Sequence, residues 1–317
     1  MEISEAKLKL DSVKDNIGKA IVGKDEVIRQ ILICFLAGGH VLLEDMPGTG
    51  KTMLAKSLAR SINATFSRIQ FTPDLLPADI TGLNIYNRAE EKFQFVPGPI
   101  MTNILLADEI NRATPRTQSA LLEAMQEEQV TVDGETRSLN KPFFVIATEN
   151  PVETAGTFPL PEAELDRFMM QLSVGSLSVE EEVEMLKRYE NAEPAKDLQP
   201  VITVDELLEI RKLLEKVTVN ADLLKYIATI SDETRKDTGI YMGVSPRGSL
   251  LLLKAAKASA LIDGRDFVLP DDIKNLLLPV FLHRILFVSR RDRASKAEYL
   301  NSIINRTTVP SEEFNLS

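Results

Sequence analysis

The residues best suited to chemistry form a short loop near the N-terminus. An apolar run, 41–43, is followed by Glu44-Asp45-Met46-Pro47-Gly48-Thr49-Gly50-Lys51-Thr52, and a helical pattern begins at Met53. A glycine-bearing loop between a strand and a helix is the context of the phosphate-binding P-loop. Its backbone N–H groups would cradle anionic oxygens, Lys51 would reach the β- and γ-phosphates, and the Thr52 hydroxyl would bind Mg²⁺. The alternative is a surface turn that happens to contain two glycines.

A pair of acids follows a later apolar run. Residues 103–107 are typical of a buried parallel strand, and Asp108 and Glu109 end it. Asp108 would hold Mg²⁺, directly or through water, and Glu109 would orient and activate the water that attacks the γ-phosphate. Paired acids also occur at ordinary strand-to-loop boundaries. Their distance from the loop, about one βαβ unit plus an insertion, favours the functional interpretation.

Three further polar residues could belong to the same site. Asn150 follows the apolar run 143–147, and polar groups at the carboxyl ends of parallel strands commonly contact ligands. Arg167 follows an acidic helix that begins near Pro161, and Arg247 falls in the first turn of a helix opened by Pro246. Taken singly, each of the three is more often a turn residue or a solvated side chain than a catalytic group.

Composition excludes several classes of protein. The net charge of −10 argues against indiscriminate binding to nucleic acid, which depends on Lys and Arg. A single cysteine, Cys34, excludes an internal disulfide framework, and with only two histidines a structural zinc site is not expected. The N-terminus has no signal-peptide pattern, and no apolar run approaches the roughly 20 residues of a membrane span. We therefore expect a soluble, cytoplasmic protein.

The elements that must position these residues follow from periodicity. Helices are expected over 1–20 and 24–37, and strands over 41–44, 66–70, 103–107, 143–147 and 169–173. Because strand-like and helix-like stretches alternate up to about residue 189, a parallel sheet covered by helices is predicted. Two hairpins interrupt the alternation, at 83–86 with 93–96 and at 130–132 with 136–139.

The C-terminal third has a different pattern. A polar stretch, 190–197, is predicted to be a linker. Beyond it, helical patterns indicate a second, all-helical domain; they cover 204–217, 221–236, 246–263 and 270–287.

Together, the motifs resemble those of an AAA+ ATPase, and their sequences are similar to those of the MoxR family. In the general P-loop pattern, the position of Asp45 is the first glycine. Leu42-Leu43-Glu44-Asp45-x-Pro47-Gly48-x-Gly50-Lys51-Thr52 is the family's version of the loop, so Asp45 fits the family pattern. Two further strings match closely: Ala107-Asp108-Glu109-Ile110-Asn111-Arg112-Ala113, and the run 147–163 from Ala147-Thr148 through Asn150-Pro151 to Glu162-Ala163. The similarity covers nearly the whole chain.

The resemblance implies an α/β fold with an αβα P-loop core over 1–192 and a C-terminal helical lid over 198–317. The core would include a helix-2 insert and a pre-sensor-1 hairpin, which are the two predicted hairpins. The nucleotide would be ATP with Mg²⁺, bound by the Walker A residues. These are Asp45, Met46, Pro47, Gly48, Thr49, Gly50, Lys51, Thr52 and Met53. Val22 and Gly23 match the segment that packs on adenine.

Roles for the other residues are implied in the same way. Asp108 and Glu109 would be Walker B, with Asp108 and Thr52 on Mg²⁺. Asn150 would be sensor 1, Arg247 sensor 2, and Arg167 an arginine finger that acts on the neighbouring subunit of a hexameric ring. Such a finger contributes roughly 10³–10⁵ to turnover. Arg112 and Arg116 also lie near the expected interface, and whether Arg247 acts in cis or in trans stays open.

The function implied is a chaperone-like ATPase that remodels, matures or assembles client proteins. Members of the family commonly work with a partner that carries a von Willebrand factor A domain, often to insert a metal or cofactor. Two alternatives stay open: a nucleic-acid motor, which the acidic balance disfavours, and a non-catalytic nucleotide switch, which Glu109 disfavours.

Overall fold

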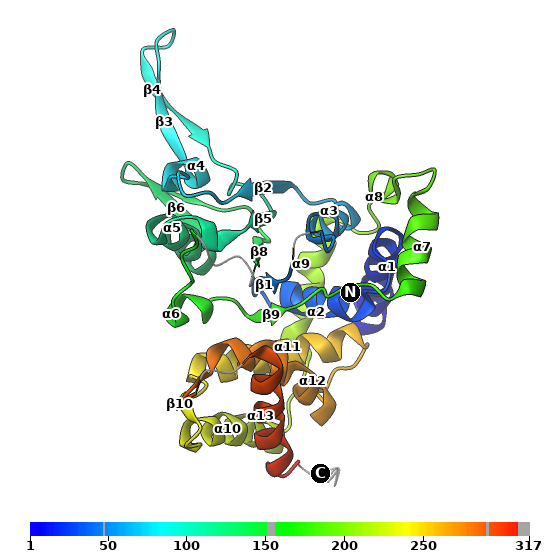
Figure 1. Ribbon diagram of the computed structural model, residues 1–317. Coiled ribbons are helices and arrows are strands. Elements are labelled where there is room, and N and C mark those ends of the chain that lie inside the picture. The colour runs from blue at the N-terminus through cyan, green and yellow to red at the C-terminus, as the bar shows by residue number, and fades with distance from the viewer. Residues whose placement is uncertain (47, 151–155, 290–291, 310–317) are drawn as a thin grey trace.

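The computed structural model describes residues 1–46, 48–150, 156–289 and 292–309. Pro47, one of the predicted nucleotide-binding residues, lies outside them. An α/β part comes first, and a mainly helical part lies below it in Figure 1.

The centre of the α/β part is a parallel sheet of five strands. In spatial order they are β2 (Phe66–Gln70), β5 (Ile104–Asp108), β8 (Phe144–Glu149), β1 (Val41–Glu44) and β9 (Met170–Leu172). β1, β5 and β8 are runs of buried apolar residues, as strands covered on both faces must be. The predicted parallel sheet is confirmed: the limits of β1 and β2 match the prediction, and those of β5, β8 and β9 differ by one or two residues.

Alternating side chains of the sheet enter two separate cores. Leu43, Leu106 and Ile146 pack with α1 (Ile3–Ala20), α2 (Asp25–Leu36) and α3 (Lys51–Ser61). Their neighbours Leu42, Leu105 and Val145 pack on the other face, against α5 (Pro115–Glu127). The period of two that defines a strand therefore produces a helix–sheet–helix sandwich, which Figure 1 shows edge-on, with α5 on one side of the strands and α1 and α3 on the other.

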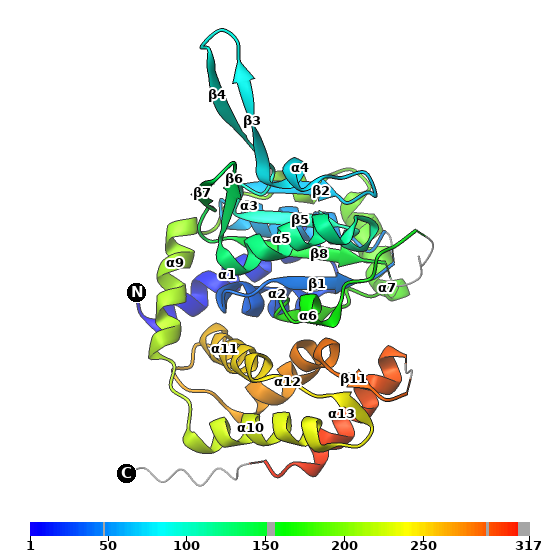
Figure 2. The ribbon, with the colours of Figure 1, turned by 90° about the vertical axis from the view of Figure 1, so that its left-hand side faces the viewer.

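Two hairpins extend from this sandwich, as predicted. β3 (Gly82–Asn87) and β4 (Lys92–Pro97) follow the short helix α4 (Pro77–Thr81) and project far from the sheet in both views (Figures 1 and 2). β6 (Gln129–Val132) and β7 (Glu135–Ser138) are joined at Asp133-Gly134, where both residues have positive φ. That backbone is the one a tight hairpin turn requires.

Within the α/β part, a 3₁₀ turn (Ile110–Arg112) joins β5 to α5, and α6 (Glu162–Leu165) precedes β9. After β9, the chain reaches the helical part through α7 (Val179–Tyr189), α8 (Pro194–Asp197) and α9 (Val204–Lys212) with its 3₁₀ extension (Leu213–Lys216). The predicted linker, 190–197, thus contains one helical turn. The helical part itself consists of α10 (Ala221–Lys236), α11 (Pro246–Ile262), α12 (Pro270–Phe281) and α13 (Arg293–Arg306), with a small antiparallel pair, β10 (Ile240–Met242) and β11 (Leu286–Phe287).

The prediction of one helix over 270–287 is wrong. α12 ends at Phe281, a 3₁₀ turn covers Leu282–Arg284, and β11 pairs with β10. The chain leaves the helix where Arg284, a buried side chain, turns to bind Asp166 and the carbonyl oxygens of Phe168 and Met169. Helix α13 was not predicted, because its apolar residues are few and weakly periodic.

Within the described residues, no helix is both long enough and apolar enough to cross a membrane.

Candidate functional site

The loop after β1 has the conformation of a phosphate cradle. Gly48 and Gly50 adopt φ of 86° and 85°, a left-handed backbone that glycine adopts at little cost. A Cβ at either position would meet no atom within 4 Å, so the requirement for glycine is conformational. Gly50 caps α3, whose first N–H groups therefore face the loop. A helix N-terminus beside the backbone N–H groups of a glycine-bearing loop favours an anion.

Lys51 lies across this loop. Its Nζ donates to the carbonyl oxygens of Asp45 and Met46, at 2.9 and 3.1 Å. Burial lowers the pKa of Lys51, and the nearby carboxylates of Asp45, Asp108 and Glu109 oppose that shift. The ammonium group is thus held at the loop by weak neutral acceptors, and an anionic oxygen would be a stronger partner.

Asp45 has a structural task in addition to its place in the loop. Its buried carboxylate accepts hydrogen bonds from Ser173 Oγ (2.7 Å), from the backbone N–H of Val174 (2.5 Å) and from that of Gly175 (3.1 Å). These bonds tie the start of the loop to the segment that follows β9. The side chain is therefore turned toward that segment, and the backbone carbonyl is the group that contacts Lys51.

The two acids lie at the carboxyl end of β5, as the sequence predicts for a sheet edge. Asp108 Oδ1 accepts from the hydroxyl of Thr148, at 2.7 Å, and the same hydroxyl accepts from the backbone N–H of Glu109, at 2.8 Å. Glu109 has φ 57° and ψ 52°, a left-handed backbone that is uncommon for a residue with a side chain. Strain of this kind is typical of functional sites.

Side chains from β2 hold both acids. Arg68 donates to Asp108 Oδ2, with Nη2 at 2.6 Å, and the amide of Gln70 donates to Glu109 Oε2, at 2.7 Å. Arg112 Nη1 lies 3.0 Å from the same Glu109 oxygen. The register of β2 on β5 places Gln70 opposite Asp108, so these contacts follow directly from strand pairing.

A cleft of about 440 Å³ joins these groups and is here named the phosphate cleft. Its described lining residues are Asp45, Gly48, Thr49, Gly50, Lys51, Thr52, Met53, Arg68, Gln70, Asp108, Glu109, Thr148, Glu149 and Asn150. It contains a loop with anion-binding N–H groups, one lysine, and the oxygens of Thr52 and Asp108. Hydroxyl and carboxylate oxygens are the ligands that Mg²⁺ prefers, so the donor set fits a magnesium–phosphate complex.

Glu149 is the member of this cleft with the most perturbed acidity. It stands opposite Glu44 where β8 pairs with β1. Burial and the charge of Glu44 raise the pKa of Glu149 to about 7. Arg293, from α13, makes an ion pair with Glu44.

A second cleft of about 550 Å³, here named the apolar cleft, adjoins the loop on its other side. Ile21, Val22, Met46, Met53, Met185 and Tyr189 are among the residues that line it. Gly23 lies beside this cleft, with φ 68°, and a Cβ there would meet Glu181 of α7 at 2.2 Å. A flat apolar ring such as adenine suits these walls, and Gly23 lets the N-terminal turn approach α7.

Arg167 and Arg247 lie elsewhere. Neither appears among the described residues that line the two clefts. Both are near Asp166, which directly precedes Arg167 and whose Oδ2 is 3.9 Å from Nε of Arg247. Asp166 is fixed by Arg284 Nε, at 2.8 Å, and burial lowers the pKa of Arg284 to about 10. The two predicted arginines therefore form one cluster at the junction of the α/β and helical parts.

Sequence reasoning missed Arg68, Gln70, Thr148, Glu149 and Arg284. The first two alternate with apolar residues along β2, and Thr148 and Glu149 precede Asn150 at the end of β8. Their positions near strand ends were visible, but the strand order that joins them to Asp108 and Glu109 was not. No sequence signal distinguished Arg284.

Comparison with known proteins agrees with this geometry. Residues 40–170 match the model of the ATPase family associated with various cellular activities (AAA), and residues 232–303 match the AAA lid domain. The chain is 50% identical over 277 residues to the uncharacterized protein YeaC of Bacillus subtilis, covering 87% of both chains. It is 39% identical over 305 residues to Chaperone MoxR1 of Mycobacterium tuberculosis, covering 93% of this chain and 80% of that protein.

Further matches point the same way. Protein MoxR of Paracoccus denitrificans is 30% identical over 292 residues, which cover 84% of this chain and 85% of that protein. A crystal structure of a candidate ATPase from Cytophaga hutchinsonii superposes with a TM-score of 0.90 at 39% identity, covering 98% of this chain and 97% of the other. The chain belongs to the MoxR family of AAA+ ATPases.

Proposed function

We propose that this chain hydrolyses ATP in the presence of Mg²⁺, within a hexameric ring of identical copies, to remodel or assemble client proteins. The observation that carries the hydrolytic part is the placement of Glu109 in the same cleft as Lys51 and Thr52. A carboxylate beside the phosphate cradle is the group that a hydrolase needs and a simple binding site does not.

Each residue of the phosphate cleft would have a distinct task. The loop N–H groups and Lys51 would bind the β- and γ-phosphates, and Thr52 and Asp108 would hold Mg²⁺, which neutralises charge on the phosphates. Glu109 would orient the attacking water and accept its proton. Asn150, which lines the same cleft, would hydrogen-bond that water or the γ-phosphate.

The base would be the adenine of ATP, held in the apolar cleft. Val22 and Met53 line that cleft, and the turn at Gly23 closes its edge against α7. Apolar walls with few polar groups are typical of sites for such ligands.

The position of the arginines supports a ring. Arg167 and Arg247 cluster around Asp166, away from the described lining of both clefts. An arginine that stabilises transferred phosphate is supplied either in cis or by another molecule. We infer that this cluster serves the nucleotide of a neighbouring copy, which gives Arg247 a role in trans.

The first hairpin offers a surface for clients. Ile85, Tyr86 and Phe93 are exposed on β3 and β4, on the part of the chain that projects farthest from the sheet (Figure 1). Exposed apolar groups on a protruding element favour protein contact. We propose that this hairpin binds the client protein. A partner with a von Willebrand factor A domain would bring the client to the hairpin.

The experiment that tests the hydrolytic proposal replaces Glu109 by Gln. Binding of a fluorescent ATP analogue should persist, and turnover of ATP should fall by roughly 10²–10⁴, because the general base is lost. Glu123→Gln, at an exposed position on α5, is the matched control and should keep both properties. Unchanged turnover in Glu109→Gln would exclude Glu109 as the base, and tight binding without turnover in the unmodified protein would favour a nucleotide switch.

A further inference from the structure

Arg284 is a buried arginine of the helical part that binds mainly to the α/β part. Its side chain is only 1% exposed. Besides the carboxylate of Asp166, at 2.8 Å, it donates to the backbone carbonyl oxygens of Asp166 (3.1 Å), Phe168 and Met169 (3.2 Å). A buried guanidinium group is costly unless such acceptors satisfy its N–H groups. One side chain of the helical part therefore holds four acceptors within residues 166–169.

These acceptors lie on both sides of Arg167 in the chain. The carbonyl groups of Asp166 and Phe168 belong to the residues directly before and after it. The backbone N–H of Arg167 donates to the carbonyl oxygen of Glu164, at 3.1 Å. Among the described residues, no hydrogen bond or ion pair engages the Arg167 side chain. The backbone of Arg167 is thus fixed, while its guanidinium group is not committed to a contact within the described chain.

Helix α11 packs closely on the same guanidinium group. Gly248 lies in the first turn of α11, directly after Arg247. A Cβ at Gly248 would lie 3.0 Å from Cδ of Arg284 and 2.7 Å from Cγ1 of Val244. Glycine is therefore needed here for close approach. The segment that carries Arg167 and the helix that carries Arg247 both rest on Arg284.

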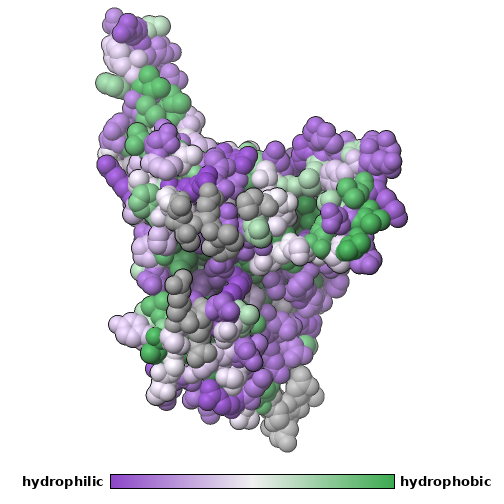
Figure 3. Space-filling view, in the orientation of Figure 1, coloured by the Kyte–Doolittle hydropathy of each residue, from purple (hydrophilic) through white to green (hydrophobic). Residues whose placement is uncertain are grey.

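This cluster lies where the two parts of the chain meet. Helix α6 ends at Leu165, just before Asp166, and it lies against the 3₁₀ turn that contains Arg284. Figure 2 shows α6 directly above the helical part. Figure 3 shows hydrophilic side chains at the centre of the molecule, between the two parts. The side chains of Phe168 and Met169 are buried in separate apolar cores, so Arg284 adds control over the orientation of the peptide groups.

We propose that Arg284 is a positioning residue for Arg167: by holding the peptide groups around Arg167, it sets the direction in which that side chain leaves the chain. The proposal rests on the catalytic role of Arg167 in the proposed function and adds the residue that prepares it. A catalytic group misplaced by about 1 Å can cost about 10²-fold in rate. Because Arg284 belongs to the helical part, a shift of the helical part would also move Arg167.

Replacing Arg284 by Lys tests this role. Lysine keeps the positive charge but lacks the planar fork that reaches several acceptors at once. We expect kcat for ATP to fall by roughly 10–10². KM should stay within about twofold, because Arg284 is not among the described lining residues of either nucleotide cleft. A raised KM with unchanged kcat would overturn the positioning role.

Arg265→Lys is the matched control. Arg265 also belongs to the helical part, and it binds the buried carboxylate of Asp272 through two hydrogen bonds of 2.7 Å. Its loss should lower the melting temperature and leave kcat unchanged, since Arg265 does not contact residues 166–169 in the described structure.

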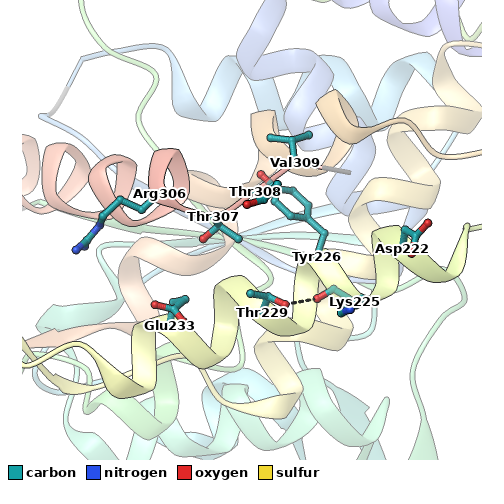
Figure 4. A pocket seen from close by; sticks show the side chains of 9 residues that line it. All are labelled: Asp222, Lys225, Tyr226, Thr229, Glu233, Arg306, Thr307, Thr308 and Val309. Carbon is teal, nitrogen blue, oxygen red and sulfur yellow. Dashed lines mark hydrogen bonds between the residues drawn. The ribbon is translucent and has the colours of Figure 1, made fainter. Parts of the chain in front are cut away.

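A milder change in the helical part provides a second control. Tyr226 of α10 is buried, and its hydroxyl has no hydrogen-bond partner among the described residues. It lines a cleft of about 700 Å³ between α10 and the end of α13, where Figure 4 shows its ring pointing toward Thr308. Tyr226→Phe should leave kcat unchanged. If both controls lost as much kcat as Arg284→Lys, turnover would respond to any change in the helical part, which would overturn the proposal.

A double-mutant cycle connects the effect to Arg167. If Arg284 acts through Arg167, the double variant Arg167→Ala with Arg284→Lys should turn over ATP at the rate of Arg167→Ala alone, because the group to be positioned is absent. Fold-losses that multiply in the double variant would overturn the positioning role alone. Full turnover in the single variant Arg167→Ala would overturn the catalytic role of Arg167, and this inference with it.

A variant that retains Arg284 covers the case in which Arg284→Lys does not fold. Gly248→Ala places a methyl group against Cδ of Arg284 and so displaces the guanidinium group without removing it. It should lower kcat in the unmodified background and have no further effect beside Arg167→Ala. An equal fold-loss in both backgrounds would overturn the proposal.

Discussion

Gln70 donates its side-chain amide to Oε2 of Glu109, at 2.7 Å. The two residues come from neighbouring strands, and Gln70 lies opposite Asp108 in the register of β2 on β5. The proposed general base is therefore engaged by an uncharged donor and by Arg112, at 3.0 Å. These two contacts fix the orientation of the carboxylate at the carboxyl end of β5. Gln70 thus restrains Glu109 in the absence of nucleotide.

Replacing Gln70 by Leu should release Glu109 and raise basal ATP turnover about two- to fivefold. A hydrogen bond to a charged group contributes about 1.5–3 kcal/mol, of which only part appears in the barrier. Gln126→Leu is the control, because that exposed amide donates to its neighbour Glu127 on the surface of α5. Steady-state turnover measured without a client tests the idea, and a fall in turnover would show that Gln70 assists the base.

Strand pairing explains which parts of the site could be predicted. Lys51, Thr52, Asp108, Glu109 and Asn150 each stand at a strand end or in the loop, so local pattern located them. Arg68 and Gln70 are polar residues on a strand, and their role depends on β2 lying next to β5. That adjacency is set by tertiary packing of the whole sheet.

The helices and strands also differ in how well they could be predicted, depending on whether local sequence or distant contacts determine them. Strands β1 and β2 were predicted to the residue, because buried apolar runs and short alternating runs are local signals. The end of α12 was missed, because it depends on a distant contact between Arg284 and Asp166. Helix α13 was missed because its sequence is mostly polar and its buried residues are few.

Asp45 should contribute to stability as well as to nucleotide binding. In Asp45→Ala, the buried N–H of Val174 and that of Gly175 lose their acceptor, and each unsatisfied group costs about 1–3 kcal/mol. We expect the free energy of unfolding to fall by about 2–4 kcal/mol in urea titrations. Asp133→Ala, at an exposed hairpin turn, should have a smaller effect. Equal losses in the two variants would contradict the structural role.

Glu149 should make stability depend on pH. Its pKa is raised to about 7, above the ordinary glutamate value of 4.5, so the folded state prefers the neutral form. The contribution of this preference to the stability of the folded state is fully present below pH 4.5 and is lost as the pH rises through 7. Glu149→Gln should therefore raise the melting temperature at pH 8 and change it little at pH 5. The exposed Glu91→Gln should be neutral at both, and a gain confined to pH 5 would refute this sign.

Arg167 should act on a neighbouring copy. In Arg167→Ala, ATP binding should stay nearly intact, while turnover falls by roughly 10³ and no longer rises with protein concentration. The sharper measurement mixes this variant with Glu109→Gln, since each is inactive by a different loss. In a mixed ring, some sites combine an intact Glu109 with an intact Arg167 from the next copy, so turnover should recover to a substantial fraction of normal. No recovery, although sedimentation shows mixed rings, would mean that Arg167 serves its own site or none.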